Sequence, residues 1–389
     1  MTELVSPSLP GPVALLSRHE RLQRSAAVNE RVISFAGGLP NPALFPRSAL
    51  IRALHQALSD PSCPALQYGW PEGSAVLRNF VARALAARGA AIDSDQVLIT
   101  SGAQQALGIA LQATIRKNDA VGIEPETYPG ALEALRVAKA ELVSLEAAAR
   151  AYYVMPSISN PRGLPLDPAV RHALLHRVRK QRAIVIEDDA YGETAFVGTP
   201  GRPLLADLPD RTFHVGTFSK TLAPGLRVGW LIAPKQFMRD VLAVKQTQDL
   251  QANTLAQAAL ERYLSGERYS RQLHKLRANY RRRARRLARS LALHLPDFRF
   301  QAPAGGFSIW LESPLSVDDE AFFETALRHG VTFDSGRPFR WQSQQRGLAL
   351  RVCYSTVAED DIETGVLRLA RAWAEMTARA REAPTPIAR

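Results

Sequence analysis

The chain has 389 residues, 46% hydrophobic and 22% charged, which is long enough for two domains with sizeable cores. With 24 Gly and 26 Pro, the composition argues against collagen-like, coiled-coil and disordered proteins. No apolar run reaches the roughly eighteen residues of a membrane-spanning helix, and the start, MTELVSPSLPGPVALL, does not resemble a signal peptide. Two cysteines, Cys63 and Cys353, are too few for a disulfide framework and favour the reducing cytoplasm.

The net charge of +12 leaves nucleic-acid binding open as an alternative. The densest basic stretch is RANYRRRARRLARSLALHL, residues 277–295. We expect a long amphipathic helix there, with its arginines facing water, because apolar positions recur near helical spacing. These positions are Tyr280, Ala284, Leu287, Leu291 and Leu293. Since no zinc-finger spacing, RNP-like strand motif or basic zipper accompanies the stretch, we expect no nucleic-acid partner.

Taken in chain order, short apolar runs alternate with helical patterns, which predicts an α/β fold with a doubly wound, mainly parallel sheet. The run 183–188, AIVIED, is apolar on both faces, as a buried parallel strand requires. The expected strands lie at 96–100, 120–124, 141–145, 151–156, 183–188, 212–217 and 227–233.

The pattern changes beyond a helical span near 236–294. Helices at 318–329 and 359–378 then alternate with strand-like runs, which indicates a smaller α+β domain. The runs are FRFQAP, GFSIWLE, VTF and LALRVCYS. We therefore divide the chain into an N-terminal arm, a large domain and a small domain, at residues 1–45, 46–289 and 290–389. A helix is expected at 15–28, and the tail REAPTPIAR is expected to be disordered.

Candidate site residues follow the strands, because ligands of open α/β sheets bind beyond the carboxyl ends of the strands. Residues 101–105, SGAQQ, open a helix whose free N–H groups could hold a phosphate, although many βα turns look alike. Residues 187–189, EDD, end the next candidate strand. One of these acids could be a buried carboxylate with a cationic partner, or all could be solvated or cap a turn.

A lysine marks the end of strand 212–217. Lys220 lies between two hydroxyl residues, Ser219 and Thr221, and precedes a glycine-containing loop that ends at Arg227. This position suits an amine nucleophile near an anion, although a solvated lysine is the ordinary alternative.

Nine motifs carry a more specific signal because they occur in a fixed order. They are SFAGGLPNPALFP (34–46), LQYGWPEG (66–73), SGAQQAL (101–107), EPETYPG (124–130), SNPRG (159–163), EDDAYGE (187–193), GTFSKTLAPGLRVGW (216–230), PAGGFSIWL (303–311) and RVCYS (351–355). From about residue 31 to 375 the chain resembles the fold-type I aminotransferases that use pyridoxal phosphate (PLP). It is most similar to the branch with α-aminoadipate and kynurenine aminotransferases and the C-terminal domains of MocR-type regulators.

The resemblance implies a three-layer PLP-dependent transferase fold, with a mainly parallel seven-stranded sheet in the large domain, and a PLP site. It assigns Lys220 to the aldimine and to proton transfer at the substrate Cα. Family spacing selects Asp188 to pair with the pyridinium nitrogen, a choice that side-chain alternation leaves open. Tyr191 and Asn160 would hydrogen-bond the phenolic oxygen of the ring, and Tyr128 would stack on the ring face.

The resemblance also implies phosphate and substrate contacts. The phosphate would be bound by Ala103, Gln104, Thr217, Ser219 and Arg227. Tyr68 would reach the phosphate of a neighbouring subunit, which implies a homodimer with shared active sites. Arg351 would bind the substrate α-carboxylate bidentately, with Asn160 and Gly38 completing the substrate site. No metal site is expected.

Three segments depart from the family pattern. The segment ELVSLEAAARAYYVMP is shorter than usual, Phe333-Asp334-Ser335-Gly336 replaces a VPG-like turn, and Arg162 is unusual in SNPRG. Arg162 could recognise an acidic group or face water. Only about thirty residues precede SFAGGLP, too few for the winged helix of a MocR-type regulator, so we expect an enzyme.

The leading hypothesis is an aminotransferase that moves the amino group of an L-α-amino acid to a 2-oxo acid. The alternative keeps PLP but changes the reaction to that of a lyase, decarboxylase or oxidase, because the groups around the cofactor select which bond breaks.

Overall fold

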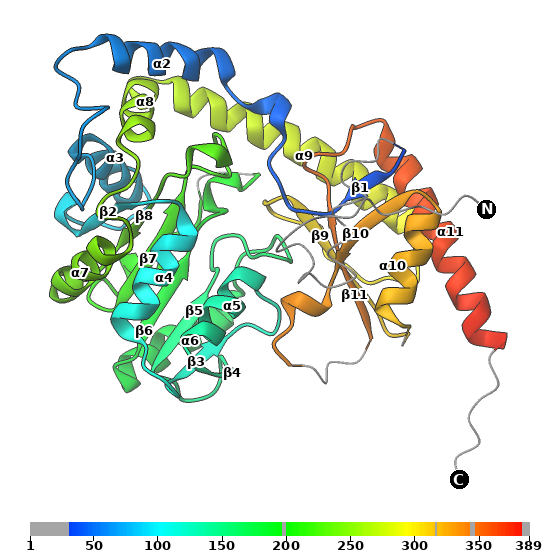
Figure 1. Ribbon diagram of the computed structural model, residues 1–389. Helices are drawn as coiled ribbons and strands as arrows, with labels where there is room; N and C mark the ends of the chain where they lie inside the picture. The colour runs from blue at the N-terminus through cyan, green and yellow to red at the C-terminus, as the bar shows by residue number, and fades with distance from the viewer. Residues whose placement is uncertain (1–30, 197–199, 316, 343–346, 383–389) are drawn as a thin grey trace, which may run out of the picture.

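The computed structural model describes residues 31–196, 200–315, 317–342 and 347–382. A larger and a smaller sheet lie side by side, and the long helix α9 (Arg268–His294) runs from one to the other (Figure 1). No helix within these ranges is both long and apolar enough to cross a bilayer. The helix expected at 15–28 lies outside the described residues.

The larger sheet has seven strands in the order β2-β8-β7-β6-β5-β3-β4, and only β8 runs antiparallel to the others. The expected mainly parallel sheet is confirmed, with each strand overlapping its predicted range. The strands are β2 (Val97–Thr100), β3 (Ala120–Ile123), β4 (Glu141–Ser144), β5 (Ala151–Val154), β6 (Ile184–Asp188), β7 (Thr212–Thr217) and β8 (Gly229–Ile232).

Helices cover both faces of this sheet, because alternate side chains of its central strands point to opposite sides. On β5 and β6, Tyr153 and Ile186 join one apolar cluster, while Tyr152 and Val185 join another with Leu174 of α6. The result is the three-layer arrangement. The helices around the sheet are α2 (Arg47–Ser59), α3 (Ala75–Ala86), α4 (Ala103–Thr114), α5 (Pro129–Val137), α6 (Pro168–Gln181), α7 (Met238–Asp249) and α8 (Thr254–Leu264).

The smaller sheet has the order β1-β10-β11-β9 and packs with α10 (Asp319–Arg328) and α11 (Asp361–Glu382). β1 comes from the N-terminal arm and pairs in parallel with β10. The four strands are β1 (Ile33–Phe35), β9 (Ser308–Ser313), β10 (Val331–Ser335) and β11 (Leu348–Cys353). The proposed domain boundary at 289/290 falls inside α9.

Three expectations for this half are wrong in detail. FRFQAP forms no strand, because only Arg299 pairs with Glu312 before the chain turns toward Gly163. Helix α11 continues to Glu382, so the tail REAPTPIAR begins within a helix. The basic stretch is helical as expected, but Leu293 is 71% exposed while Arg283 is buried, donating to the carbonyl of Val357.

Candidate active site

A pocket of about 130 Å³ opens where β2, β3, β5, β6 and β7 end. Ten of the residues predicted to bind or act on PLP line it, although they come from segments up to 124 positions apart, from Ala103 to Arg227. The lining residues are Ala103, Gln104, Leu107, Tyr128, Met155, Asn160, Asp188, Ala190, Tyr191, Thr217, Ser219, Lys220 and Arg227.

Asp188 brings a carboxylate to the pocket from the last position of β6. The hydroxyl of Tyr153 donates to Asp188 Oδ2 over 2.7 Å, and the backbone N–H of Ala190 donates to Oδ1 over 3.0 Å. Burial raises the pKa of Asp188, and these hydrogen bonds oppose that rise. The carboxylate is therefore buried and held in place, and a cationic partner would stabilise its ionised form.

The two acids that flank Asp188 point elsewhere. Glu187 accepts the backbone N–H groups of Leu204 and Leu205, both at 2.9 Å, and so acts as a buried cap. Asp189 lies 2.5 Å from Arg88 Nη1 and 3.3 Å from His214 Nε2. Sequence alternation left the choice among these acids open, and the structure places only Asp188 in the pocket.

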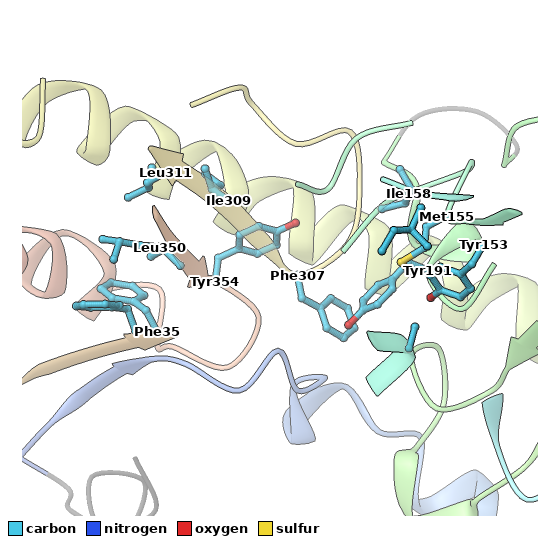
Figure 2. Close-up of a cluster of buried hydrophobic side chains, with 14 of the residues drawn as sticks. Phe35, Tyr153, Met155, Ile158, Tyr191, Phe307, Ile309, Leu311, Leu350 and Tyr354 are labelled. Atoms are coloured by element: carbon cyan, nitrogen blue, oxygen red, sulfur yellow. The ribbon is translucent and has the colours of Figure 1, made fainter. Parts of the chain in front are cut away.

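Lys220 reaches the pocket from the turn after β7. Its Nζ lies 5.0 Å from the ring centroid of Tyr191 and 5.7 Å from that of Phe307. These two rings meet edge to face with centroids 5.3 Å apart. Figure 2 shows Tyr191 beside Tyr153 and Met155, with Phe307 linking them to the apolar side chains of the small sheet. The lysine amine thus lies next to two packed aromatic rings.

Anion donors gather at the start of α4. Gly102 is the N-cap of α4 and has a φ of +86°. The first turn of α4 presents backbone N–H groups that have no partner within the helix. A Cβ at Gly102 would lie 2.6 Å from Arg227 Nη2, so only glycine lets this guanidinium approach. Arg227 Nη2 donates to the carbonyl of Ser101 over 3.1 Å, and the hydroxyls of Thr217 and Ser219 lie 2.9 Å apart.

Tyr128 borders the same end of the pocket. Its hydroxyl donates to Gln104 Oε1 over 3.2 Å, and burial raises the pKa of the phenol. The predicted ring-stacking and phosphate-binding segments are therefore tied together.

Of the predicted substrate residues, Asn160 lines the pocket, whereas Arg351 and Gly38 adjoin it. Arg351 Nη1 donates to Asn160 Oδ1 over 3.0 Å, and Gly38 lies against the guanidinium. Arg351 also pairs with Asp334, at 2.7 Å between Nη2 and Oδ2. Tyr68 is 78% exposed and does not line this pocket.

Arg162 is committed to carboxylates of its own chain. It lies 2.8 Å from Glu126 and 3.4 Å from Glu312, and Arg340 joins the same cluster. Both acidic partners are intramolecular, so the unusual arginine links a loop of the large sheet to β9.

The sequence analysis did not identify four residues that contact Asp188, Asp189, Lys220 or Arg351. Tyr153 and Phe307 lie within runs that looked like ordinary strand or turn sequence, and Arg88 is 101 positions from Asp189. Asp334 was noticed only as a departure from the family pattern. The register between β10 and β11 could have identified Asp334, because this register places it directly opposite Arg351.

Comparison with known proteins identifies the family of the chain. Residues 46–369 match the family described as aminotransferase class I and II. The chain belongs to this family. The 2-aminoadipate transaminase of Thermus thermophilus is 33% identical over 364 residues, covering 88% of this aminotransferase and 90% of the relative.

Solved structures and regulators are also similar. The α-aminoadipate aminotransferase LysN of Thermus thermophilus, crystallised with N-(5'-phosphopyridoxyl)-L-leucine, has a TM-score of 0.84 and 30% identity, covering 92% of this chain and 95% of LysN. The uncharacterised HTH-type transcriptional regulator YdcR of Escherichia coli is 31% identical over 81% of this chain and 71% of YdcR. The fold and the family make this chain a PLP-dependent aminotransferase, with amino acids and 2-oxo acids as its substrates.

The donor set of the pocket fits PLP. A helix start, two hydroxyls and a guanidinium suit a phosphate dianion. A buried carboxylate suits a protonated ring nitrogen, and a lysine amine suits an aldehyde. All of these groups line one pocket.

Proposed function

We propose that Lys220, Asp188 and Tyr191 carry out amino-group transfer from an L-α-amino acid to a 2-oxo acid. The observation that carries this assignment is the convergence of all three on one pocket, together with five of the residues expected to bind the phosphate. When bound, PLP supplies an aldehyde that exchanges amino groups and a ring that withdraws electrons from the substrate Cα.

Asp188 holds a proton on the ring nitrogen. An opposite charge beside its buried carboxylate offsets the desolvation that otherwise raises its pKa. The Tyr153 hydroxyl, which donates to Asp188 Oδ2, fixes the direction of that carboxylate. A rotated or neutral side chain at this position would no longer keep the ring protonated.

Lys220 moves the proton at the substrate Cα. Its Nζ lies near the rings of Tyr191 and Phe307, inside the pocket that would receive the substrate Cα. When PLP is bound, Tyr191 and Asn160 would donate to the phenolic oxygen of its ring, and Tyr128 would stack against the ring.

The phosphate is held by Ala103, Gln104, Thr217, Ser219 and Arg227. Arg351 binds the substrate α-carboxylate, and Gly38 leaves room for it, because a Cβ there would come within 3.1 Å of Arg351 Nη1. The cluster of Arg162 with Glu126 and Glu312 supports no recognition of an acidic side chain by Arg162.

A second copy of the chain completes the site. Leu66, Tyr68 and Trp70 are 83%, 78% and 77% exposed, which is unusual for three large apolar or aromatic side chains in one short segment. In a homodimer this segment is covered, and Tyr68 reaches the phosphate of the partner. The two free cysteines, Cys63 and Cys353, fit the cytoplasm as the location of this enzyme.

The assignment is tested with purified protein, PLP and a panel of amino acids that includes L-2-aminoadipate and L-leucine. A reactive amino acid should convert the cofactor to pyridoxamine phosphate, seen as loss of the visible absorbance of the lysine-bound cofactor. Lys220→Ala should lose at least about a thousandfold in this half-reaction, since the proton-transfer group is gone. Lys275→Ala on α9 is the matched control and should keep wild-type rates. Release of ammonia, carbon dioxide or peroxide without pyridoxamine phosphate would contradict the assignment.

A further inference from the structure

The guanidinium of Arg351 is enclosed on both faces. The centroid of the Phe339 ring lies 4.6 Å from Arg351 Cζ. Gly38 lies close to the guanidinium, since a Cβ on this glycine would be only 3.1–3.2 Å from the guanidinium atoms. The residue is buried, with 8% of its surface exposed. A buried cation of this kind is costly unless an anion compensates it.

Asp334 provides that anion. It lies directly opposite Arg351 in the antiparallel pair β10 and β11. Its Oδ2 accepts from Arg351 Nε over 2.9 Å and from Nη2 over 2.7 Å, and the two side chains are 12% and 10% exposed. The ion pair is therefore built into the sheet.

The remaining groups around Asp334 keep it fixed. Its two oxygens accept the backbone N–H of Gly37 at 3.0 and 3.1 Å, next to Gly38. The Cys353 thiol donates to Oδ2 over 3.7 Å, and burial raises the pKa of that thiol to about 12, so it adds no charge near neutral pH. Arg351 is thus the cation that faces Asp334 in these contacts.

Room for a substrate carboxylate nevertheless remains on Arg351. A guanidinium has five N–H donors in a fixed fork. Asp334 takes the edge formed by Nε and Nη2, and Asn160 takes one donor of Nη1. Among the contacts of the described residues, one donor on each of Nη1 and Nη2 is left, which is the number that a bidentate carboxylate requires.

We propose that Asp334 sets the selectivity of the substrate site by neutralising Arg351 before the substrate arrives. A substrate carboxylate then meets a neutral ion pair, and its binding places two carboxylates beside one buried arginine. Like charges within a few ångströms oppose each other strongly in a buried site. The enzyme therefore binds the α-carboxylate weakly and discriminates less between carboxylates and neutral analogues than a lone arginine would. This inference rests on the proposed binding of the α-carboxylate by Arg351.

The test compares two unreactive probes of the same shape, 4-methylpentanoate and 4-methylpentanamide, on the PLP-loaded enzyme. Their dissociation constants are measured by calorimetry for wild type and Asp334→Asn. The asparagine keeps the shape and one acceptor oxygen but removes the charge. We expect the carboxylate to bind at least about tenfold more tightly to Asp334→Asn, since one unit of like charge is removed, with the amide changed less than about threefold.

Two further variants make the outcome decisive. Asp334→Ser removes the charge with a smaller side chain and should tighten carboxylate binding in the same direction if the asparagine variant does not fold. Asp319→Asn is the matched control, because Asp319 accepts from the neighbouring Ser335 and does not contact Arg351. It should leave both dissociation constants unchanged.

The result that overturns the inference is a folded Asp334→Asn or Asp334→Ser enzyme that binds the carboxylate no more tightly than wild type. Equal tightening of the amide would overturn it too, since a charge effect must distinguish the probes. Failure of the proposed function looks different, because wild type would then convert no amino acid in the panel whatever the variants do with 4-methylpentanoate.

Discussion

Asp188 and Asp189 are adjacent in the chain and both buried, yet their surroundings act on them in opposite directions. Burial alone would raise the pKa of both carboxyls. At Asp189, Arg88 and His214 outweigh burial and hold the pKa well below its usual range, whereas the pKa of Asp188 is raised. Arg88 thereby keeps Asp189 ionised and balances its negative charge. The same guanidinium donates to the Ser157 hydroxyl and to the carbonyl of Gly201.

Replacing Arg88 by methionine should destabilise the fold by about 3 kcal/mol at pH 7, because Asp189 would be left as a buried charge without its main partner. The lowered pKa of Asp189 means that the pair stabilises wild type above the unfolded pKa of about 4 and loses that effect as the pH falls. The deficit of Arg88→Met should therefore be smaller at pH 3, below that unfolded pKa, than at pH 7. Urea unfolding at both values measures it.

The control for this prediction is Arg286→Met on α9. Arg286 pairs with Asp360, whose side chain is 99% exposed, so its loss should cost no more than about 0.5 kcal/mol at either pH. If Arg88→Met cost as little as this control, the buried pair with Asp189 would not contribute as argued.

At the scale of elements, α7 supports the turn that holds the phosphate donors. Asp249, at the end of α7, accepts from Ser101 Oγ at 3.0 Å and from Gln105 Nε2 at 2.8 Å, and it pairs with the buried Lys245. Ser101 is also the residue whose carbonyl accepts from Arg227. The helix thus anchors both ends of the segment that begins α4.

Asp249→Ala should raise the dissociation constant for PLP about thirtyfold, since two hydrogen bonds of about 1 kcal/mol each no longer order the turn. Titration of the apoenzyme with PLP, followed by absorbance, gives this constant. Asp240→Ala, an exposed acid in the first turn of the same helix, is the control and should bind PLP as wild type does. Weaker folding with an unchanged PLP constant would mean that α7 stabilises the protein without shaping the phosphate site.

The elements of the large sheet were predictable because buried parallel strands are apolar on both faces and end in small or polar turns. The strand predicted at FRFQAP is wrong because its residues alternate as in a strand, but only Arg299 pairs with another segment, at Glu312. The pocket residues were identified through ordered motifs, not periodicity, as the choice of Asp188 over Asp189 shows. Arg88 could not be assigned, because packing brings it to a partner 101 positions away. Asp334 was not assigned, because its contact with Arg351 depends on the register between β10 and β11.

At the scale of the whole molecule, one apolar cluster of the described residues is continuous between the two sheets. The apolar cluster that lines the pocket through Met155 and Tyr191 continues through Phe307 to Tyr354 and Leu350 of the small sheet (Figure 2). The pocket and Arg351, the proposed substrate arginine, therefore adjoin one packed cluster. The exposed segment of Leu66, Tyr68 and Trp70 is the surface that we propose a second copy of the chain covers.

Shared sites make a prediction about hybrid dimers. Lys220→Ala should be inactive, and Tyr68→Phe should be inactive at limiting PLP, because it lacks one phosphate donor. A hybrid of the two has one pocket with Lys220 intact that receives Tyr68 from the Lys220→Ala subunit. If Tyr68 serves the partner's phosphate, hybrids isolated through two different affinity tags should recover about half of wild-type activity at limiting PLP, one intact site of two. If Tyr68 served its own pocket, both sites of the hybrid would be defective and no activity would return.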